Sequence, residues 1–442
     1  MKKIKNTDIV SNGIVYRKAE DGYGVYTYTE DLPENVIVPE EIEGQPVTVL
    51  TEKCFADSLI CQITLPDNLR KIESWAFRKC LKLEEMKIPD DVQEVCYAAF
   101  KQCKNLRRLE LGRHTKTVGM DLCVGCKKIE EFIVWDEIEH IDSSAFRDSR
   151  KTLKHTEFSY GLYLGNPENP YLILDSNISF KKEHDLVTVE VHPNTKFITS
   201  CAFNKFYDGA VWFDQIDRLI LHNNIQRIEG GAFNLSFFGG LLGDNGIEVC
   251  VDSIETLCRA GNAARNCRKL LVNGREIRDL VIPATVKKIA PDTFSNCRWL
   301  ESVTFEGSLE EIGYHAFRNC KQLKSIQFCG SVGEIGSEAF YSCIRLEKLE
   351  LPEVNEIGYE AFAVGPAYLI ARTKEEKRQD DLALYAGQGL RELRFNGKVG
   401  LVKRHAFALN QRLETIDGLE NLQSIDESGD LFRYTPFEGM LK

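Results

Sequence analysis

One pattern of hydrophobic and polar positions recurs along most of the chain. Each copy has a small or apolar residue before a Phe, a small residue three positions after it, and an aliphatic residue three positions later. Two apolar residues flanking a usually polar one come next, and two aliphatic residues precede the next Phe. The Phe position advances by 23 residues from Phe77 to Phe100. It is readable twelve times, at Phe55, Phe77, Phe100, Cys123, Phe146, Phe203, Phe233, Phe294, Phe317, Phe340, Phe362 and Phe407.

The two parts of each copy predict different local structures. The apolar-x-apolar triplet alternates, as in Leu109-Glu110-Leu111, which predicts a short strand with two side chains facing inward. A Pro often follows, as at Pro89, and ends the strand because it cannot donate to a ladder. Around the Phe, apolar residues are spaced by three or four, which favours one helical or 3-10 turn.

A single copy encloses no core, whereas stacked copies bury their Leu, Ile and Phe side chains against their neighbours. We therefore predict one solenoid over residues 36–432, with strands about 4.8 Å apart. Length alone would suggest roughly three domains of about 150 residues each. Residues 13–28 alternate and contain the turn signal Asp21-Gly22, so residues 1–35 are expected to form a hairpin cap. Residues 433–442 are the C-terminal end.

Irregular steps between Phe positions place insertions in this array. They fall near 158–185, 204–213, 234–278 and 363–389, and a helix is expected in the third one near Cys258. The step from Phe362 to Phe407 is about twice the repeat length. We therefore also predict a worn repeat there, with Ala383-Leu384 in the Phe position, and a solvated helix over 373–381.

The unit L-x-x-L-x-L-P-x-x-V-x-x-I-x-x-x-A-F-x-x-C resembles the BspA-like, Treponema pallidum-type leucine-rich repeat over most of residues 36–432. Residues 161–174 resemble the hairpin that such proteins place between repeats, and 270–283 resemble their strand-turn-strand re-entry. The resemblance implies an α/β repeat solenoid. It would be a right-handed arc with short parallel strands on the concave face, short helical or 3-10 turns opposite, and a β-hairpin N-terminal cap. It also implies a binding role, frequently on bacterial surfaces and sometimes as an adhesin.

Composition narrows the classes of partner and location. The 56 basic and 67 acidic residues give a net charge of −11, which argues against a nucleic-acid partner for the whole molecule. No apolar run approaches the roughly 20 residues that span a bilayer, and the basic N-terminus has no apolar signal region. We therefore expect a cytoplasmic protein as the sequence stands. The alternative is a cell-surface or secreted protein, as is common in the family that it resembles.

The fifteen cysteines allow either a disulfide framework or reduced thiols. Six of them occupy the small-residue position of the repeat, where packing explains them. Packing also explains Cys123-Val-Gly-Cys126, although a C-x-x-C alone would suggest redox or metal chemistry. We expect mostly reduced thiols, with an oxidised alternative left for pairs off the repeat register such as Cys258 and Cys267.

No catalytic constellation stands out in the sequence. The eight His residues show no metal-ligand spacing, and acidic pairs such as Asp380-Asp381 fall on segments expected to be solvated. We expect no enzymatic activity, no cofactor and no metal site. The rival is an enzyme or glycan-binding factor that uses the 234–290 insertion. It would require a pocket with clustered carboxylates of perturbed pKa.

The outward side chains of the strands offer a candidate binding surface. In leucine-rich repeats this row lies on the concave face, and its mixed charges favour a polar protein or peptide, although an ordinary solvated sheet face explains the row equally well. The candidate contacts are Lys87, Glu110, Arg108, Glu131, Ile133, Glu157, Glu190, Gln327, Lys348, Glu350 and Arg394. Tyr163 and Tyr171 on the hairpin are a second candidate, because exposed aromatic residues often anchor interfaces; turn packing is the alternative.

These observations predict a monomeric, non-catalytic scaffold that binds a protein or peptide of unknown identity through its concave face. The alternative is a bacterial cell-surface adhesin that binds host or microbial proteins.

Overall fold

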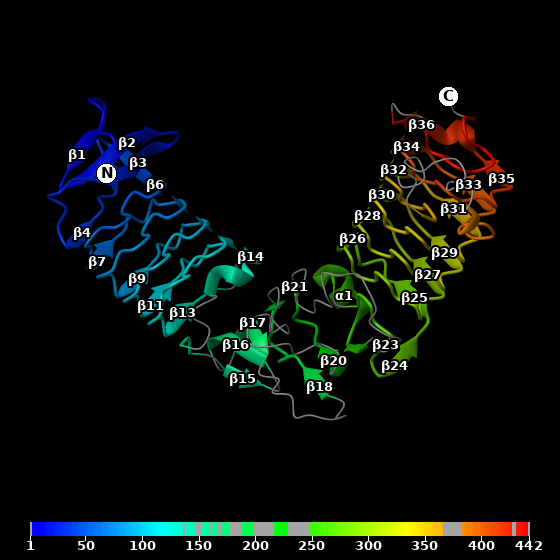
Figure 1. Ribbon diagram of the computed structural model, residues 1–442, viewed down its shortest axis with the longest axis horizontal. Coiled ribbons are helices and arrows are strands. Elements are labelled where there is room, and N and C mark those ends of the chain that lie inside the picture. Colours follow the sequence, from blue (N-terminus) through cyan, green and yellow to red (C-terminus); the bar gives the residue numbers. More distant parts are fainter. Residues whose placement is uncertain are drawn as a thin grey trace. The chain divides into compact units, whose positions relative to one another are not determined.

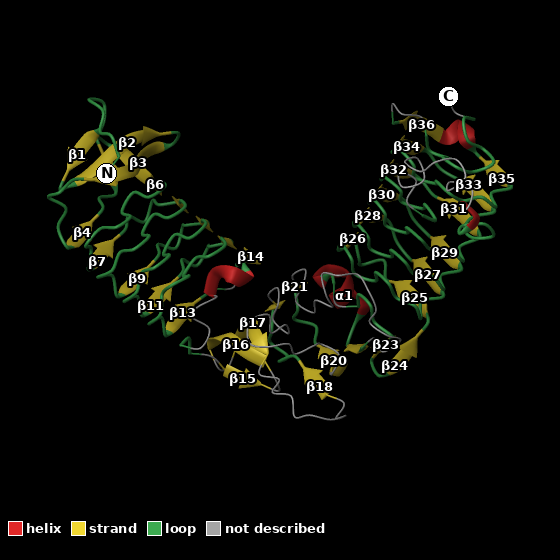
Figure 2. Cartoon of the chain, in the orientation of Figure 1, coloured by secondary structure: helices red, strands yellow, loops and turns green. Residues whose placement is uncertain are grey.

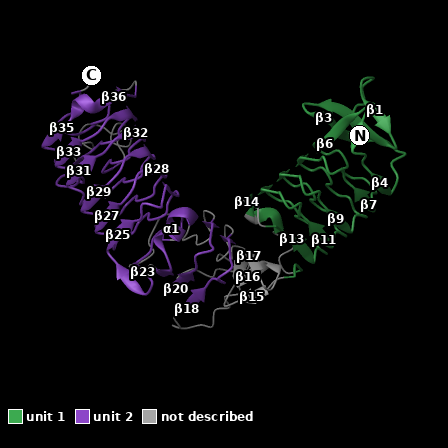
Figure 3. Cartoon of the chain, turned by 180° about the vertical axis from the view of Figure 1, so that it is seen from behind, with its two compact units in different colours: residues 1–178, 199–204 green, residues 179–198, 205–442 purple. Residues whose placement is uncertain are grey.

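The structure is a computed structural model. It describes residues 2–135, 138, 140–146, 152–154, 156–158, 161–166, 169–176, 187–198, 216–228, 247–262, 264–365, 382–426 and 430–440. The chain divides into two compact units, residues 1–178 with 199–204 and residues 179–198 with 205–442 (Figure 3). The repeat positions Phe203 and Phe233 lie outside the described residues.

Both units are built from two parallel strands per coil, which stack into separate ladders (Figure 1). We call the strand formed by the apolar-x-apolar triplet the triplet strand, and the strand formed by the two later aliphatic residues the second strand. The triplet strand agrees with the sequence prediction. The second strand was not predicted, because its aliphatic residues, such as Leu309 and Ile312, are spaced by three rather than two.

The first unit begins with an antiparallel sheet of β1 (Ile9–Ser11), β2 (Ile14–Ala19) and β3 (Gly22–Tyr28), so the hairpin predicted at Asp21-Gly22 is present. Its triplet strands are β4 (Asn35–Ile37), β7 (Gln62–Thr64), β9 (Glu85–Lys87), β11 (Arg108–Glu110) and β13 (Glu131–Ile133). Its second strands are β6 (Gln45–Leu50), β8 (Lys71–Ile72), β10 (Glu94–Val95), β12 (Thr117–Val118) and β14 (His140–Ile141), with β5 (Glu41–Ile42) paired to β6. Strand β3 continues this second ladder by pairing in parallel with β6.

The predicted hairpin at 161–174 is present as β16 (Gly161–Asn166) and β17 (Asn169–Ser176), with β15 (Thr156–Phe158) pairing to β16. The second unit starts with the parallel strands β18 (Val187–Glu190), β20 (Ile216–Leu221), β22 (Glu248–Val251) and β23 (Lys269–Val272). Strand β24 (Arg275–Ile277) then turns back on β23, and β25 (Asp279–Ile282) follows it. These strands form the strand-turn-strand that the sequence predicted.

From β25 the second unit is regular. Its further triplet strands are β27 (Ser302–Phe305), β29 (Ser325–Phe328), β31 (Lys348–Leu351), β33 (Glu392–Phe395) and β35 (Thr415–Asp417). Its second strands are β19 (Phe197–Ile198), β21 (Arg227–Ile228), β26 (Lys288–Ile289), β28 (Leu309–Ile312), β30 (Val332–Ile335), β32 (Val354–Ile357), β34 (Val399–Val402) and β36 (Leu422–Ile425). Helical segments are short, as Figure 2 shows: η1 (Ser143–Phe146), α1 (Ile254–Ala260) and η3 (Leu419–Asn421). Helix α1 lies in the predicted insertion, and the Ser253 side chain caps it by accepting a hydrogen bond from the Thr256 N–H.

The core of each unit is a stack of repeated side chains. Equivalent residues of neighbouring coils pair in register, for example Leu109 with Phe132, so inward residues stay inward. The Phe rings stack face to face at 5.2 Å from Phe77 to Phe100 and at 5.0 Å from Phe317 to Phe340. Stacking continues from Phe407 to Phe432 at 5.6 Å, so one further ring joins the stack after the last Phe position that was read from the sequence.

The segments around the Phe differ from the helical turns that the sequence predicted. Residues 143–146 do form a 3-10 turn, but around most of the other described Phe positions the residues two before and two after the Phe adopt positive φ, as at Trp75 (58°) and Lys79 (60°) around Phe77. A left-handed residue stops helical propagation. The N–H of Phe77 therefore reaches the next coil and donates to the carbonyl oxygen of Ala99 at 2.8 Å. The segments around the Phe positions are therefore turns that main-chain hydrogen bonds link from one coil to the next. We call this side of each unit the edge of turns.

The prediction of a worn repeat after Phe362 is wrong. The N–H of Phe362 donates directly to the carbonyl oxygen of Ala406 at 2.7 Å, and β32 pairs with β34. The intervening residues therefore add no coil, and Leu384, placed by prediction in a core position, is 66% exposed. The segment has the length of a repeat without its set of aliphatic residues. The helix predicted over 373–381 lies outside the described residues.

Candidate functional site

The outward side chains of the triplet strands form the surface that we call the triplet face. Lys87, Gln327, Lys348, Glu350 and Arg394 are exposed there, as predicted from the sequence. The remaining described candidates are partly exposed: Arg108, Glu110, Glu131, Ile133 and Glu190. Glu157, Tyr163 and Tyr171 belong to β15, β16 and β17, but their side chains lie outside what the structure describes.

In the first unit, the parallel pairing of β11 with β13 brings several candidate binding residues into one ion-paired group. Arg108 of β11 lies beside Glu131 of β13, with Nε 3.3 Å from Oε2, and it also contacts Glu110 at 2.6 Å. Lys154 contacts Glu131 at 2.5 Å. That hydrogen bond, more than any other contact, holds the pKa of Glu131 below its usual value. Much of the charge on this part of the triplet face is therefore already neutralised within the protein.

In the second unit, opposite charges also face one another across strands. Arg394 of β33 lies between Glu350 of β31, at 3.8 Å, and Asp417 of β35, at 3.0 Å. Lys348 pairs with Glu392 at 2.7 Å. These pairs are exposed, so each contributes at most about 1 kcal/mol to stability. Their side chains remain accessible to a ligand.

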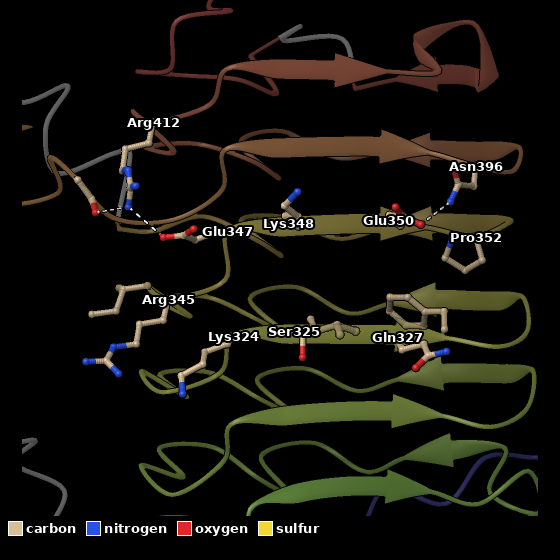
Figure 4. A pocket seen from close by; sticks show the side chains of 14 residues that line it. Lys324, Ser325, Gln327, Arg345, Glu347, Lys348, Glu350, Pro352, Asn396 and Arg412 are labelled. Carbon is tan, nitrogen blue, oxygen red and sulfur yellow. Dashed lines mark hydrogen bonds and ion pairs between the residues drawn. The ribbon is translucent and has the colours of Figure 1, made fainter.

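The triplet ladder of the second unit is interrupted between β29 and β31. Both strands are fully described and belong to separate sheets, β25-β27-β29 and β31-β33-β35, whereas the second strands run from β26 to β36 in one sheet. A trough of about 910 Å³ opens over this interruption (Figure 4). It includes three predicted candidates, Gln327, Lys348 and Glu350.

The floor of the trough is apolar. Ile326 and Phe328 point inward from β29, yet Ile326 is 9% exposed and Phe328 is partly exposed. The equivalent residues of the preceding coil, Val303 and Phe305, are each 1% exposed. The interruption of the ladder therefore gives a ligand access to side chains that the repeat otherwise buries.

The walls of the trough are polar and unevenly charged. Four basic residues and two acidic residues line it. Figure 4 places Lys324, Arg345 and Arg412 near the N-terminal ends of the strands, with Glu350 and Asn396 toward the C-terminal ends. Arg412 contacts Glu347 at 3.4 Å and donates to the carbonyl oxygen of Gly387 at 2.9 Å.

A second cavity, of about 730 Å³, lies beside α1, where the enzymatic alternative expected a cluster of carboxylates. Its acidic residues are Glu255, Glu310 and Glu311. Glu310 and Glu311 are ion-paired to Lys288 at 3.6 and 3.7 Å, and Glu255 accepts a hydrogen bond from Thr285 at 3.3 Å. Two of the three carboxylates are thus ion-paired, and the third is hydrogen-bonded. Across the described residues, no group of three or more His, Cys, Asp or Glu side chains could hold a metal ion.

The cysteines serve packing and hydrogen bonding. Cys123 and Cys126 are fully buried, and the Cys126 thiol donates to the carbonyl oxygen of Phe100 at 3.0 Å. Burial raises the pKa of the Cys123 thiol well above its usual value. None of the fourteen cysteines in the described part of the chain, Cys258 and Cys267 among them, forms a disulfide.

A family model described as "BspA type Leucine rich repeat region" matches six copies in residues 28–154 and 269–366, about half of the chain. The chain belongs to this family. The family that the repeat unit resembles is thereby confirmed, and the solenoid predicted from the periodicity agrees with it. None of the helices in the described segments is long and apolar enough to cross a membrane.

Several solved structures are similar to this leucine-rich-repeat chain. A leucine-rich repeat protein from Bacteroides ovatus is 18% identical, with 96% of this chain and 92% of that chain covered and a TM-score of 0.33. A leucine-rich cell surface protein from Faecalibacterium prausnitzii is 14% identical, with coverage of 74% and 96% and a TM-score of 0.28. The pneumococcal vaccine antigen PcpA is 15% identical, with coverage of 95% and 86% and a TM-score of 0.27. No curated protein matches the chain.

Sequence reasoning missed part of the trough of this leucine-rich-repeat chain. Lys324, Arg345 and Arg412 lie outside the triplets from which candidates were taken. One signal marks this coil in the sequence: the connection from Leu351 to Val354 is one residue shorter than that from Phe328 to Val332. This shorter connection does not by itself predict that the hydrogen-bonded ladder is interrupted between β29 and β31.

Proposed function

We propose that this leucine-rich-repeat chain is a non-catalytic binding scaffold that recognises a protein or peptide through its triplet face. We take that face to be the concave side of a right-handed arc, with residues 1–35 capping the 36–432 array. The observation that carries the proposal is the trough over β29 and β31, because it opens on this face and includes Gln327, Lys348 and Glu350. Mixed charge around an apolar floor is typical of surfaces that bind peptides.

We also propose that the protein works in a reducing compartment, with the cytoplasm as the simplest case. Free thiols are part of its packing, since Cys103, Cys126 and Cys320 donate through S–H to main-chain carbonyl oxygens of the preceding coil. A disulfide would remove the S–H donor that each of these bonds requires.

Affinity capture tests the binding proposal. The wild-type chain is compared with a triplet-face variant carrying Lys87→Glu, Glu110→Lys, Glu350→Lys and Arg394→Glu. A matched control carries Lys71→Glu, Glu94→Lys, Glu356→Lys and Lys403→Glu, which exchange the partners of two ion pairs on or beside the second strands. The triplet-face variant should lose bound proteins that the control retains, as identified by quantitative mass spectrometry. Identical bound sets for the wild type and the triplet-face variant would refute the proposal.

A further inference from the structure

We infer that the trough over β29 and β31 binds an extended peptide segment with an acidic group beside Lys324 and Arg345 and an apolar side chain over Ile326 and Phe328. The inference rests on the proposed function and names the class of ligand that this part of the triplet face accepts.

The floor supplies an apolar anchor point. Ile326 is 9% exposed although Leu349, the equivalent residue on β31, is 1% exposed. Phe328 stacks on Phe305 at 5.0 Å between ring centroids, so one side of its ring is held while the ring remains partly exposed. An apolar ligand side chain placed here would cover surface that neighbouring coils bury within the protein, which favours binding.

The charges select an acidic ligand. Four basic and two acidic residues line the trough in a chain whose net charge is −11. Arg345 is exposed and takes part in no ion pair with any residue that the structure describes. Its guanidinium can bind a carboxylate through two parallel hydrogen bonds. Lys324 is already paired with Glu301 at 2.6 Å, which leaves Arg345 as the main site for a ligand carboxylate.

The shape and polarity favour a peptide in extended form. The trough follows the direction of β29 and β31, with most of its basic side chains near the N-terminal ends of the strands and Glu350 toward the C-terminal ends, while Glu347 lies at the basic end beside Arg412 (Figure 4). At the far end, Glu350 accepts a hydrogen bond from Asn396 at 3.1 Å, and Gln327 is exposed. Amide and carboxylate groups there match the N–H groups of a peptide backbone.

A nucleic-acid strand fits this surface less well than a peptide. Its phosphates would run along the whole trough and meet the carboxylates of Glu347 and Glu350, both of which line it. Binding of single-stranded nucleic acid needs a continuous basic groove with aromatic platforms. The trough has its positive charge concentrated near one end.

Selection from a random seven-residue peptide library displayed on phage, using the immobilised full-length chain, tests the inference. Binding of the enriched peptides is then measured by fluorescence anisotropy for the wild type and three variants. Arg345→Glu reverses the unpaired charge and Ser325→Tyr fills the trough from an exposed position. Arg227→Glu is the matched control, because Arg227 is an exposed arginine on the second strand β21, away from the triplet face.

Enriched peptides should share an Asp or Glu and a large apolar residue. Arg345→Glu and Ser325→Tyr should each weaken their binding by about ten-fold or more, as expected for loss of a charge-assisted contact or of the apolar anchor, whereas Arg227→Glu should leave it unchanged. Peptides that lack an acidic residue, or that bind Arg345→Glu as tightly as the wild type, would overturn the inference and leave the proposed function standing. Enrichment of no peptide, or tighter binding of a poly-deoxythymidine probe, would also overturn it, and the capture experiment would then decide the proposed function separately.

Discussion

The thiol of Cys103 donates a hydrogen bond to the main-chain carbonyl oxygen of Phe77, one coil earlier, across 3.0 Å. Equivalent cysteines repeat this contact at 3.0 to 3.3 Å, namely Cys126 to Phe100, Cys320 to Phe294 and Cys343 to Phe317. In the last regular coil, the Asn410 side chain takes the same position and donates to the carbonyl oxygen of Phe362 at 3.0 Å. The small-residue position of the repeat is therefore also a donor position that links successive coils.

Substitutions at Cys103 separate the contribution of its S–H hydrogen bond to stability from that of its side-chain volume. Cys103→Ser keeps a small donor, whereas Cys103→Ala removes the donor and leaves a small void. We expect the Ala variant to lower the free energy of unfolding by about 1–2 kcal/mol, and the Ser variant by less. Urea unfolding at equilibrium measures both values. An Ala variant more stable than the Ser variant would show that the hydrogen bond contributes nothing.

Native thiols should differ strongly in reactivity. Burial raises the pKa of the Cys320 thiol to about 12, so almost no thiolate forms at pH 8 and the side chain is inaccessible. Cys329 is exposed. In the native protein Cys329 should react rapidly with a disulfide reagent, whereas Cys320 should react only after unfolding. Mass-spectrometric mapping of the labelled sites measures the labelling rates of Cys329 and Cys320. The Cys329→Ser variant should lose the rapid labelling that Cys329 contributes. Equal labelling rates at the two sites would contradict this account.

The edge of turns in the second unit contains a pH-sensitive group. His315 lies 3.6 Å from Asp292 and 3.3 Å from Glu338, and the Tyr314 ring stacks on it. Burial opposes its charged form, as does the nearby Arg318, but hydrogen bonding to the two carboxylates outweighs them and raises the pKa of His315 above 6.5.

Because the folded-state pKa exceeds the unfolded value, the stabilisation by His315 is complete below about pH 6.5 and is lost as the pH rises through the folded-state pKa. The free energy of unfolding should therefore fall more between pH 6 and pH 8 in the wild type than in His315→Gln. Chemical denaturation at both pH values measures this difference. An equal fall in both proteins would rule out a role for His315.

The stacked Phe rings should dominate the stability of the second unit. Phe317 is fully buried between Phe294 and Phe340, with ring centroids 5.2 and 5.0 Å away. Phe317→Ala should cost about 3–5 kcal/mol because it opens a cavity between two coils. The exposed substitution Gln327→Ala is the control and should change the unfolding free energy by less than about 0.5 kcal/mol. A comparable loss in both variants would contradict the importance of the stack.

The repeat made the core predictable because Phe317 and Leu323 recur at fixed spacing and each must be buried by the next copy. The turns were not predictable in the same way, since positive φ occurs not only at Asn319 but also at Trp75 and Ala98, which are residue types that rarely adopt it. The second strand pair Leu309 and Ile312 was missed because its spacing differs from the alternation of a strand. The worn repeat was predicted wrongly because the step from Phe362 to Phe407 has the length of two repeats. The residues around Leu384 lack the aliphatic side chains of a repeat, and this difference was given too little weight.

The candidate site was predictable only in part. Gln327 and Lys348 were found because alternation in a strand assigns each residue to one face. The trough itself depends on the interruption between the backbones of β29 and β31. That interruption also exposes Phe328, which the repeat pattern assigns to the core.

Hydrogen exchange of the full-length chain, alone and with the protein or peptide that it binds most tightly, tests the central claim most directly. If the triplet face is the binding surface, peptide segments covering β29 and β31 should exchange more slowly in the complex, while those covering β28 and β30 should be unchanged. Slower exchange confined to β28 and β30, with none at β29 and β31, would contradict the account.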